Sequence, residues 1–225
     1  MGIFALFTLV TVGIGFSILS RVLPHVAPNY KRVQKDLKTL QTEMQTWLKE
    51  PLVPIGREEL ELFSINQLQQ SIKKSFTVKA RGVFATIYNE PVLAYSFKSY
   101  IASGVNSLLY ARTAQHEYAY WLKGKEIQVL INNKLIGAFR ENGVLYNEKN
   151  RPIARINYHQ SEVAPIIVQD REVACLTKAQ VRKGDILSPR AFQFVKPDIT
   201  DEEEKILLAL ATLELVQRSI PKKAS

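Results

Sequence analysis

The chain opens on an uninterrupted apolar run. Residues 2–20 contain no charged side chain and are mostly Ile, Leu, Val, Phe and Gly. As a helix they would cover about 28 Å, which is close to the ~30 Å of hydrocarbon in a bilayer. A cleaved signal peptide is the alternative, but no basic residue precedes the run and no A-x-A-like site follows it. The pattern predicts a retained transmembrane anchor over residues 1–23.

The charges that flank this run predict its orientation. No Lys or Arg precedes it, whereas several follow it closely, and such flanks stay in the cytoplasm. We therefore expect a single-pass membrane protein whose bulk is cytoplasmic, and the unpaired Cys175 agrees with a reducing compartment. The juxtamembrane basic residues, which would also suit anionic headgroups, are Arg21, Lys31, Arg32, Lys35 and Lys38.

The polar part of the chain begins with a helical pattern over residues 30–50. Apolar positions recur there with alternating three- and four-residue steps, at Val33, Leu37, Leu40, Met44 and Trp47. One interpretation is a short coiled coil through which residues 30–50 pair two copies of the chain; the other is a helix that lays its stripe on its own domain. Two Pro residues between 51 and 56 break the pattern. Residues 24–59 are thus predicted to be a juxtamembrane helix and a linker.

From about residue 60 the pattern changes to short strands and turns. Four segments share an apolar pair, a polar turn and a second apolar strand, at residues 87–94, 130–137, 145–154 and 167–174. Asn and Asp suit such turns because they tolerate positive φ and bond the local backbone. The expected turn residues are Asn89, Asn132, Asn147 and Asp170. Consecutive hairpins without long connections predict a meandering sheet or barrel.

The last element has a different texture. Thr200 begins a capping box that opens a helix running to about Ser219. Residues 206–213 are apolar around the whole circumference, and such a helix must be buried or lie in lipid. The apolar part is too short to span a bilayer. Residues 60–220 are therefore predicted to be a closed antiparallel β-barrel around this helix, followed by a basic tail at 221–225.

These hairpins and this helix resemble the tubby C-terminal-like superfamily, which includes phospholipid scramblases and LURP-one-related proteins. The resemblance covers about residues 63–219 and rests on Ile-Gly or Ile-Ala in the returning strands and on the terminal D-E-E-E-K-I-L-L-A-L-A helix. It implies a mainly β fold, a closed barrel with a central hydrophobic helix, and anionic-lipid recognition in some members. The chain departs from scramblases in its N-terminal anchor and its lack of an acidic segment like their calcium site.

Charge adds a candidate binding site. The chain of 225 residues carries 30 Lys and Arg against 21 Asp and Glu, a formal net charge of +9. Alternation along a strand would put several basic side chains on one face, and these lipid-headgroup candidates are Lys73, Lys79, Arg81, Lys123 and Lys125. The alternative is a solvated strand face with no partner. No nucleic acid partner is expected, because no recognition helix or RNP-like aromatic motif accompanies the charge.

No motif predicts enzyme chemistry. The chain lacks phosphate-binding glycine loops, H-E-x-x-H and G-x-S-x-G. His116 beside Glu117, and His159 near Ser161 and Glu162, are more typical of polar surface residues than of acid–base pairs. With three histidines and one cysteine we expect no metal site and no cofactor. Cys175 fits a core thiol better than a nucleophile.

The sequence therefore predicts a membrane-anchored, non-enzymatic binding or scaffold protein that recognises anionic lipid headgroups or a protein partner. One alternative comes from residues 173–189, which resemble the small SAF domain of pilus-assembly and sugar-acid proteins. Such an assembly or sugar-binding protein would work outside the cytoplasm. Because that interpretation leaves the apolar terminal helix without a burial site, the position of residues 206–213 discriminates between the two.

Overall fold

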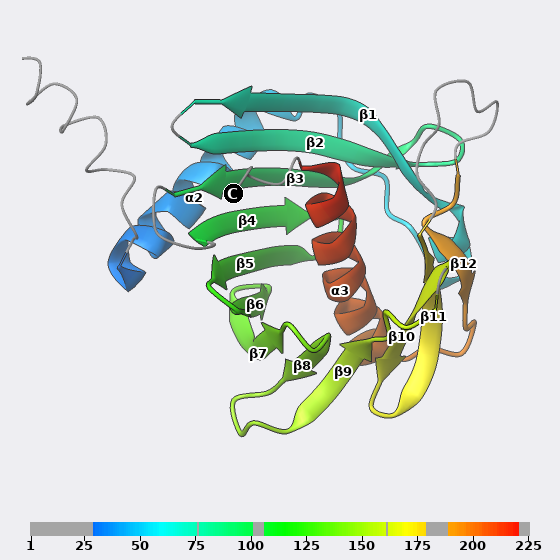
Figure 1. Cartoon of the computed structure of the whole chain (residues 1–225). Coiled ribbons are helices and arrows are strands. Elements are labelled where there is room, and N and C mark those ends of the chain that lie inside the picture. The colour runs from blue at the N-terminus through cyan, green and yellow to red at the C-terminus, as the bar shows by residue number, and fades with distance from the viewer. Residues whose placement is uncertain (1–28, 76, 101–105, 161, 179–188, 221–225) are drawn as a thin grey trace, which may run out of the picture.

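The computed structural model describes residues 29–75, 77–100, 106–160, 162–178 and 189–220. The predicted anchor, Arg21 and the basic tail lie outside these residues. Within the described ranges, no helix is both long and apolar enough to cross a membrane. The main feature is a 12-stranded antiparallel sheet whose strands pair in chain order and curl into a nearly closed barrel (Figure 1).

The elements follow one another along the chain as the sequence pattern predicts. Their bounds are α2 (Tyr30–Trp47), the 3-10 helix η2 (Arg57–Leu62), β1 (Phe63–Lys74), β2 (Val78–Thr86), β3 (Pro91–Ser99), β4 (Asn106–Arg112), β5 (Glu117–Lys123), β6 (Glu126–Ile131), β7 (Lys134–Arg140), β8 (Val144–Tyr146), β9 (Pro152–Ile156), β10 (Val163–Val168), β11 (Arg171–Thr177), β12 (Phe192–Val195) and α3 (Asp201–Ser219).

The four predicted hairpins are confirmed as β2–β3, β6–β7, β8–β9 and β10–β11. Three of the four expected turn residues have positive φ: Asn89 at 64°, Asn132 at 49° and Asp170 at 65°. In the β8–β9 turn, Asn150 takes the positive φ, 57°. Asn147 acts instead through its side chain, which accepts hydrogen bonds from the N–H groups of Lys149 and Arg151 at 3.0 and 2.9 Å.

The barrel closes where the start of β1 meets the segment before β12. Ser64 and Arg190 form a single antiparallel bridge. The N–H of Ala191 donates to the carbonyl of Phe63 at 2.7 Å, and the N–H of Ile65 donates to the carbonyl of Pro189 at 3.1 Å. Elsewhere each described strand pairs only with its sequence neighbours among the described residues. Closure therefore depends on this short seam.

Helix α3 is buried among the strands, as its composition predicts. Thr200 accepts from the N–H of Glu203, and the Glu203 carboxylate accepts from the N–H of Thr200, completing the capping box. Side chains all round the helix pack with the inward-facing residues of the sheet, and Leu207 and Leu210 are fully inaccessible. In Figure 1, α3 runs between the strands and does not lie on their outer side. The arrangement expected for the SAF alternative, with residues 206–213 outside, is not observed.

Helix α2 lies on the outer side of the barrel (Figure 1). Its stripe packs on residues of β2–β5, including Val83, Leu108 and Trp121. Of the two arrangements predicted for this stripe, the structure shows the helix laid on its own domain. Self-association through residues 30–50 would require the stripe to leave the barrel. The residues between α2 and the barrel form a second hydrophobic cluster that is buried from water.

The segment predicted as a linker also packs on the barrel. Helix α2 ends at Trp47, a few residues before the predicted end. Leu52 joins the cluster under α2, Ile55 joins the main core, and the N–H of Val53 donates to the carbonyl of Pro91 at 2.7 Å. Residues 51–56 therefore fasten α2 to the barrel.

Candidate functional site

The pairing of β1, β2 and β3 places basic side chains in one row. Lys79 is opposite Lys73 on one side and opposite Lys98 on the other. Directly paired residues of antiparallel strands point to the same face, and Arg81, two positions along β2, shares it. The structure thus brings together Lys73, Lys79 and Arg81 as predicted. It adds Lys98, which sequence analysis missed because the register of β3 is not visible in the sequence.

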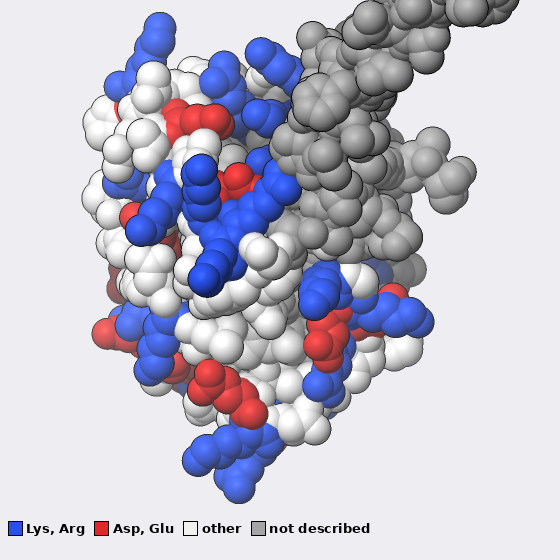
Figure 2. Space-filling model, turned by 90° about the vertical axis from the view of Figure 1, so that its left-hand side faces the viewer, with Lys and Arg blue, Asp and Glu red and all other residues white. Residues whose placement is uncertain are grey.

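A groove of about 410 Å³ runs between α2 and strands β1–β3 beside this row. We call it the basic groove; it is lined by Leu40, Glu43, Thr46, Trp47, Ser71, Lys73, Lys79, Ala80, Arg81, Ser96 and Phe97. The Arg81 guanidinium carbon lies 5.4 Å from the centre of the Trp47 ring, a cation–π distance. The side of the molecule that carries α2 and the ends of β1 and β2 is rich in Lys and Arg (Figure 2).

Lys98 has a partner within the fold. Its Nζ lies 2.9 Å from Oδ2 of Asp36, which also accepts a hydrogen bond of 2.6 Å from the Tyr100 hydroxyl. Burial alone would raise the pKa of Asp36, but the bonds from Tyr100 and Lys98 outweigh it and lower that pKa below its ordinary value. Asp36 therefore stays ionised and joins α2 to β3.

Lys73 and Lys79 have no such partner. Both side chains are exposed, and neither forms an ion pair with any residue that the structure describes. Like charges directly opposite each other in a sheet are unfavourable. The pair therefore adds nothing to the stability of the barrel and offers two cations to an external anion.

The other two predicted headgroup residues lie apart from the basic groove. Lys123 shares the face of Lys79, but β5 is three strands from β2, about 14 Å across the sheet. Its Nζ lies 5.4 Å from the centre of the Trp121 ring. Lys125 sits in the β5–β6 turn, 3.4 Å from the Glu141 carboxylate. The structure thus joins three of the five candidates in one site and separates two.

Helix α2 contributes further cations. Lys31, Lys35 and Lys38 are exposed and are not ion-paired to any described side chain. They are spaced four and three residues apart, so they share one side of the helix. Arg32 belongs to the first turn, which the Asn29 side chain caps at 3.0 Å. Together, α2 and the outer side of β1–β5 form what we call the cationic face.

The histidines considered for acid–base chemistry are not assembled into a pair. His116 immediately precedes β5, Glu117 is its first residue, and the two side chains have different partners. His116 lies 3.3 Å from the Asn132 amide, whereas Glu117 accepts a bond of 3.4 Å from Gln41 on α2. Burial and, secondarily, Lys205 lower the pKa of His116. The residues near His159 include Ser161, which lies outside the described residues.

Cys175 behaves as a core thiol. It lies buried in β11, and burial raises the pKa of its thiol, which makes it a poor nucleophile. Among the described residues, no group of three or more His, Cys, Asp or Glu side chains is arranged to hold a metal ion.

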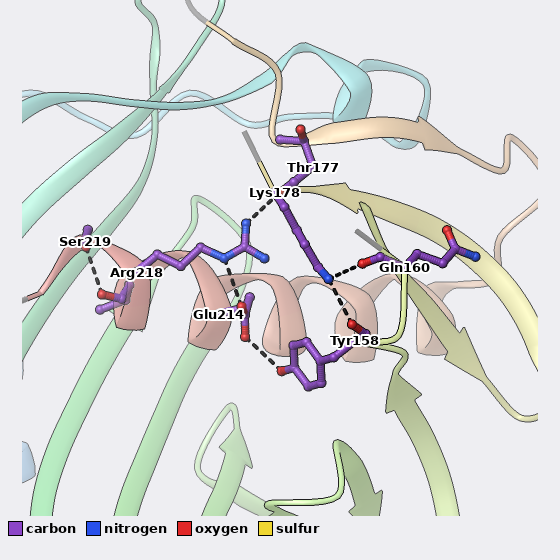
Figure 3. Close-up of polar contacts among 8 residues, drawn as sticks. Tyr158, Gln160, Thr177, Lys178, Glu214, Arg218 and Ser219 are labelled. Atoms are coloured by element: carbon purple, nitrogen blue, oxygen red, sulfur yellow. Dashed lines mark hydrogen bonds and ion pairs between the residues drawn. The ribbon is translucent and has the colours of Figure 1, made fainter. Parts of the chain in front are cut away.

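A polar network at the far end of α3 was not foreseen from the sequence (Figure 3). Glu214 accepts bonds of 2.9 Å from both the Tyr158 hydroxyl and Nε of Arg218. Arg218 also donates to the carbonyl of Thr177, and Lys178 donates to the carbonyls of Tyr158 and Gln160. The network joins the C-terminal end of α3 to the β9–β10 loop and the end of β11. Lys178 and Arg218 are bonded within this network, so its role is to stabilise the fold.

Comparison with known proteins adds no assignment. No family model, curated protein or solved structure matches the chain.

Proposed function

We propose that this chain is a membrane-anchored, non-enzymatic binding protein with a barrel of the tubby-like type, whose cationic face docks on anionic lipid headgroups. The observation that carries the proposal is the exposed Lys73–Lys79 pair, which borders the basic groove and forms no ion pair with the residues that the structure describes. Arg81, whose guanidinium lies against the Trp47 ring, adds a third cation. A guanidinium suits phosphate because its planar N–H groups can donate two parallel hydrogen bonds.

The chain length between anchor and barrel supports this orientation. Residues 24–29 separate the predicted anchor, residues 1–23, from α2, and six residues reach at most about 20 Å. The start of α2 would therefore lie near the bilayer surface, with Lys31, Lys35 and Lys38 close to it. Each Lys near an anionic surface contributes about 1 kcal/mol. Proximity and charge thus favour a lipid over a soluble ligand.

Vesicle flotation tests the lipid assignment. Residues 29–225 keep α2 and both hydrophobic clusters but leave out the predicted anchor, so any binding reports the barrel itself. We expect flotation with phosphatidylcholine vesicles that contain phosphoinositide and little with phosphatidylcholine alone. Lys73→Gln with Lys79→Gln removes about 2 kcal/mol, or roughly 30-fold in affinity.

The matched control changes two exposed cations elsewhere. Lys149→Gln with Arg151→Gln alters the β8–β9 turn, away from α2 (Figure 1), and should leave flotation unchanged. Binding that ignores anionic lipid would contradict headgroup recognition and favour a protein partner for the same face.

The proposed location of the barrel is the cytoplasm. The Lys125 side chain is 84 % exposed, and the natural Cys175 is buried, so a Lys125→Cys variant introduces one accessible thiol. An impermeant maleimide should label it only after cells are opened. Labelling of intact cells would contradict the cytoplasmic assignment and favour the extracytoplasmic alternative.

A further inference from the structure

Helix α2 has a second groove on its other side, between the helix and strands β4–β7. Its volume is about 620 Å³, within the range of roughly 300–1,000 Å³ typical of small-molecule sites. We call it the apolar groove; it is lined by Tyr30, Lys31, Val33, Gln34, Lys35, Leu37, Lys38, Gln41, Leu108, Ala119, Tyr120, Trp121, Gln128, Leu130, Asn133 and Leu135. The proposed headgroup docking uses the lysines on the helix rim of this groove but not its apolar wall.

Large apolar side chains stand on both rims of the groove. Tyr30, on the helix side, is 60 % exposed, and Leu135, on the strand side, is 38 % exposed. Leu37 and Leu130, which line the groove between these two residues, are partly buried. Trp121 also lines the groove, and the centre of its ring lies 6.5 Å from that of Tyr30. Exposed apolar side chains that face each other across a hollow are typical of a ligand site.

The charges of the groove have one sign. Lys31, Lys35 and Lys38 line the helix side, and no lining residue is Asp or Glu. None of these lysines is ion-paired to a described residue, so their ammonium groups are available to an anion. The ligand that matches the groove is therefore an amphiphile with an apolar body and a negative head.

The length of the groove limits the apolar body. The helix from Tyr30 to Gln41 is about 17 Å long. One acyl chain spans one leaflet, which is about half of the ~30 Å hydrocarbon core, so the two lengths match. We propose that the apolar groove binds one long-chain fatty acid, with its chain against Leu37, Leu130 and Trp121 and its carboxylate at Lys35 and Lys38. The fatty acid is bound non-covalently as a ligand.

Tryptophan fluorescence tests this proposal, because the chain has two Trp residues and they line different grooves: Trp47 the basic one and Trp121 the apolar one. In the full chain, Trp47→Phe leaves Trp121 as the reporter, and Trp121→Phe leaves Trp47. Titration with 9,10-dibromostearate should quench Trp121 saturably and at a concentration at least tenfold below any quenching of Trp47. Equal quenching of both, linear quenching, or none would overturn the proposal; the last would mean that the groove is closed or holds another segment.

The carboxylate contact is tested by charge reversal in the Trp47→Phe background. Lys35→Glu with Lys38→Glu should weaken quenching of Trp121 at least tenfold, and dibromo-octadecanol, which has the chain without the charge, should bind the unaltered groove as weakly. Lys49→Glu, an exposed change just after α2, is the matched control and should have no effect. If the double variant binds stearate normally, the lysine rim does not hold the carboxylate and the proposal fails. Because this assay contains no phosphoinositide, its failure is separable from failure of headgroup docking.

Discussion

At the scale of single residues, a few polar side chains link elements that are far apart in the chain. Asp36 is such a point, because it accepts bonds from Lys98 and Tyr100 on β3 and just beyond it. Asp36→Asn removes the charge and should lower the free energy of unfolding by about 1.5–2 kcal/mol. Asp170→Asn, in an exposed turn with φ of 65°, is the control and should stay within about 0.5 kcal/mol. Urea unfolding measures both; equal effects would contradict the role of Asp36.

The same carboxylate makes stability depend on pH. Its folded pKa lies below the ordinary value of 3.8. The stabilisation is therefore complete above that value and is lost as pH falls through the lower, folded pKa. The free energy of unfolding should decline more steeply as the pH falls below about 3.8 in the unaltered protein than in Asp36→Asn. Parallel pH profiles would show that Asp36 does not contribute.

Gly137 in β7 is a position where the backbone of a neighbouring strand leaves no room for a side chain. A Cβ there would overlap the carbonyl oxygen of Tyr146 in β8. Gly137→Ala should therefore destabilise the protein by more than about 2 kcal/mol, since the strands must separate. Gly124→Ala, at φ of 60° with open space around it, should cost only about 1 kcal/mol. Thermal unfolding of the two variants compares them, and similar melting temperatures would contradict the close approach.

At the scale of elements, α3 supplies the core that the short strands cannot form alone. Leu210 is fully inaccessible among strand residues. Leu210→Ala should cost about 2–5 kcal/mol because it leaves a cavity, whereas Gln217→Ala near the exposed C-terminal end of the same helix should cost less than about 0.5 kcal/mol. Denaturant midpoints measure the difference. A small loss at Leu210 would mean that the helix is not the core of the barrel.

At the scale of the whole molecule, α2 and the barrel form one folding unit. A chain beginning at residue 51 would expose Leu108, Tyr110 and Trp121, which α2 covers, and large apolar patches cause association. We expect that chain to aggregate in size-exclusion chromatography and to bind a hydrophobic dye. The chain beginning at residue 29 should elute as a monomer. Identical behaviour of the two would contradict the packing of α2.

The strength of the local signals explains what could be predicted. Hairpins and caps depend on residues close in sequence, so the four hairpins, their turn residues and the α3 capping box follow from the sequence. The sequence does not specify which turn residue adopts the left-handed backbone: in the β8–β9 turn it is Asn150, whereas Asn147 bonds the local backbone through its side chain. The terminal helix was recognisable as buried because an element that is apolar all round has no stable place in water.

Local periodicity predicts the kinds of element and their order, and the cost of exposing apolar surface requires that residues 206–213 be buried. The position of α2 is visible only in the three-dimensional fold, because an apolar stripe specifies burial but not the surface that covers it. The strand register likewise places Lys98 beside Lys79. The folded chain also pairs Lys125 with Glu141 and leaves a groove on each side of α2. These contacts join residues far apart in the chain, so no short-range pattern contains them.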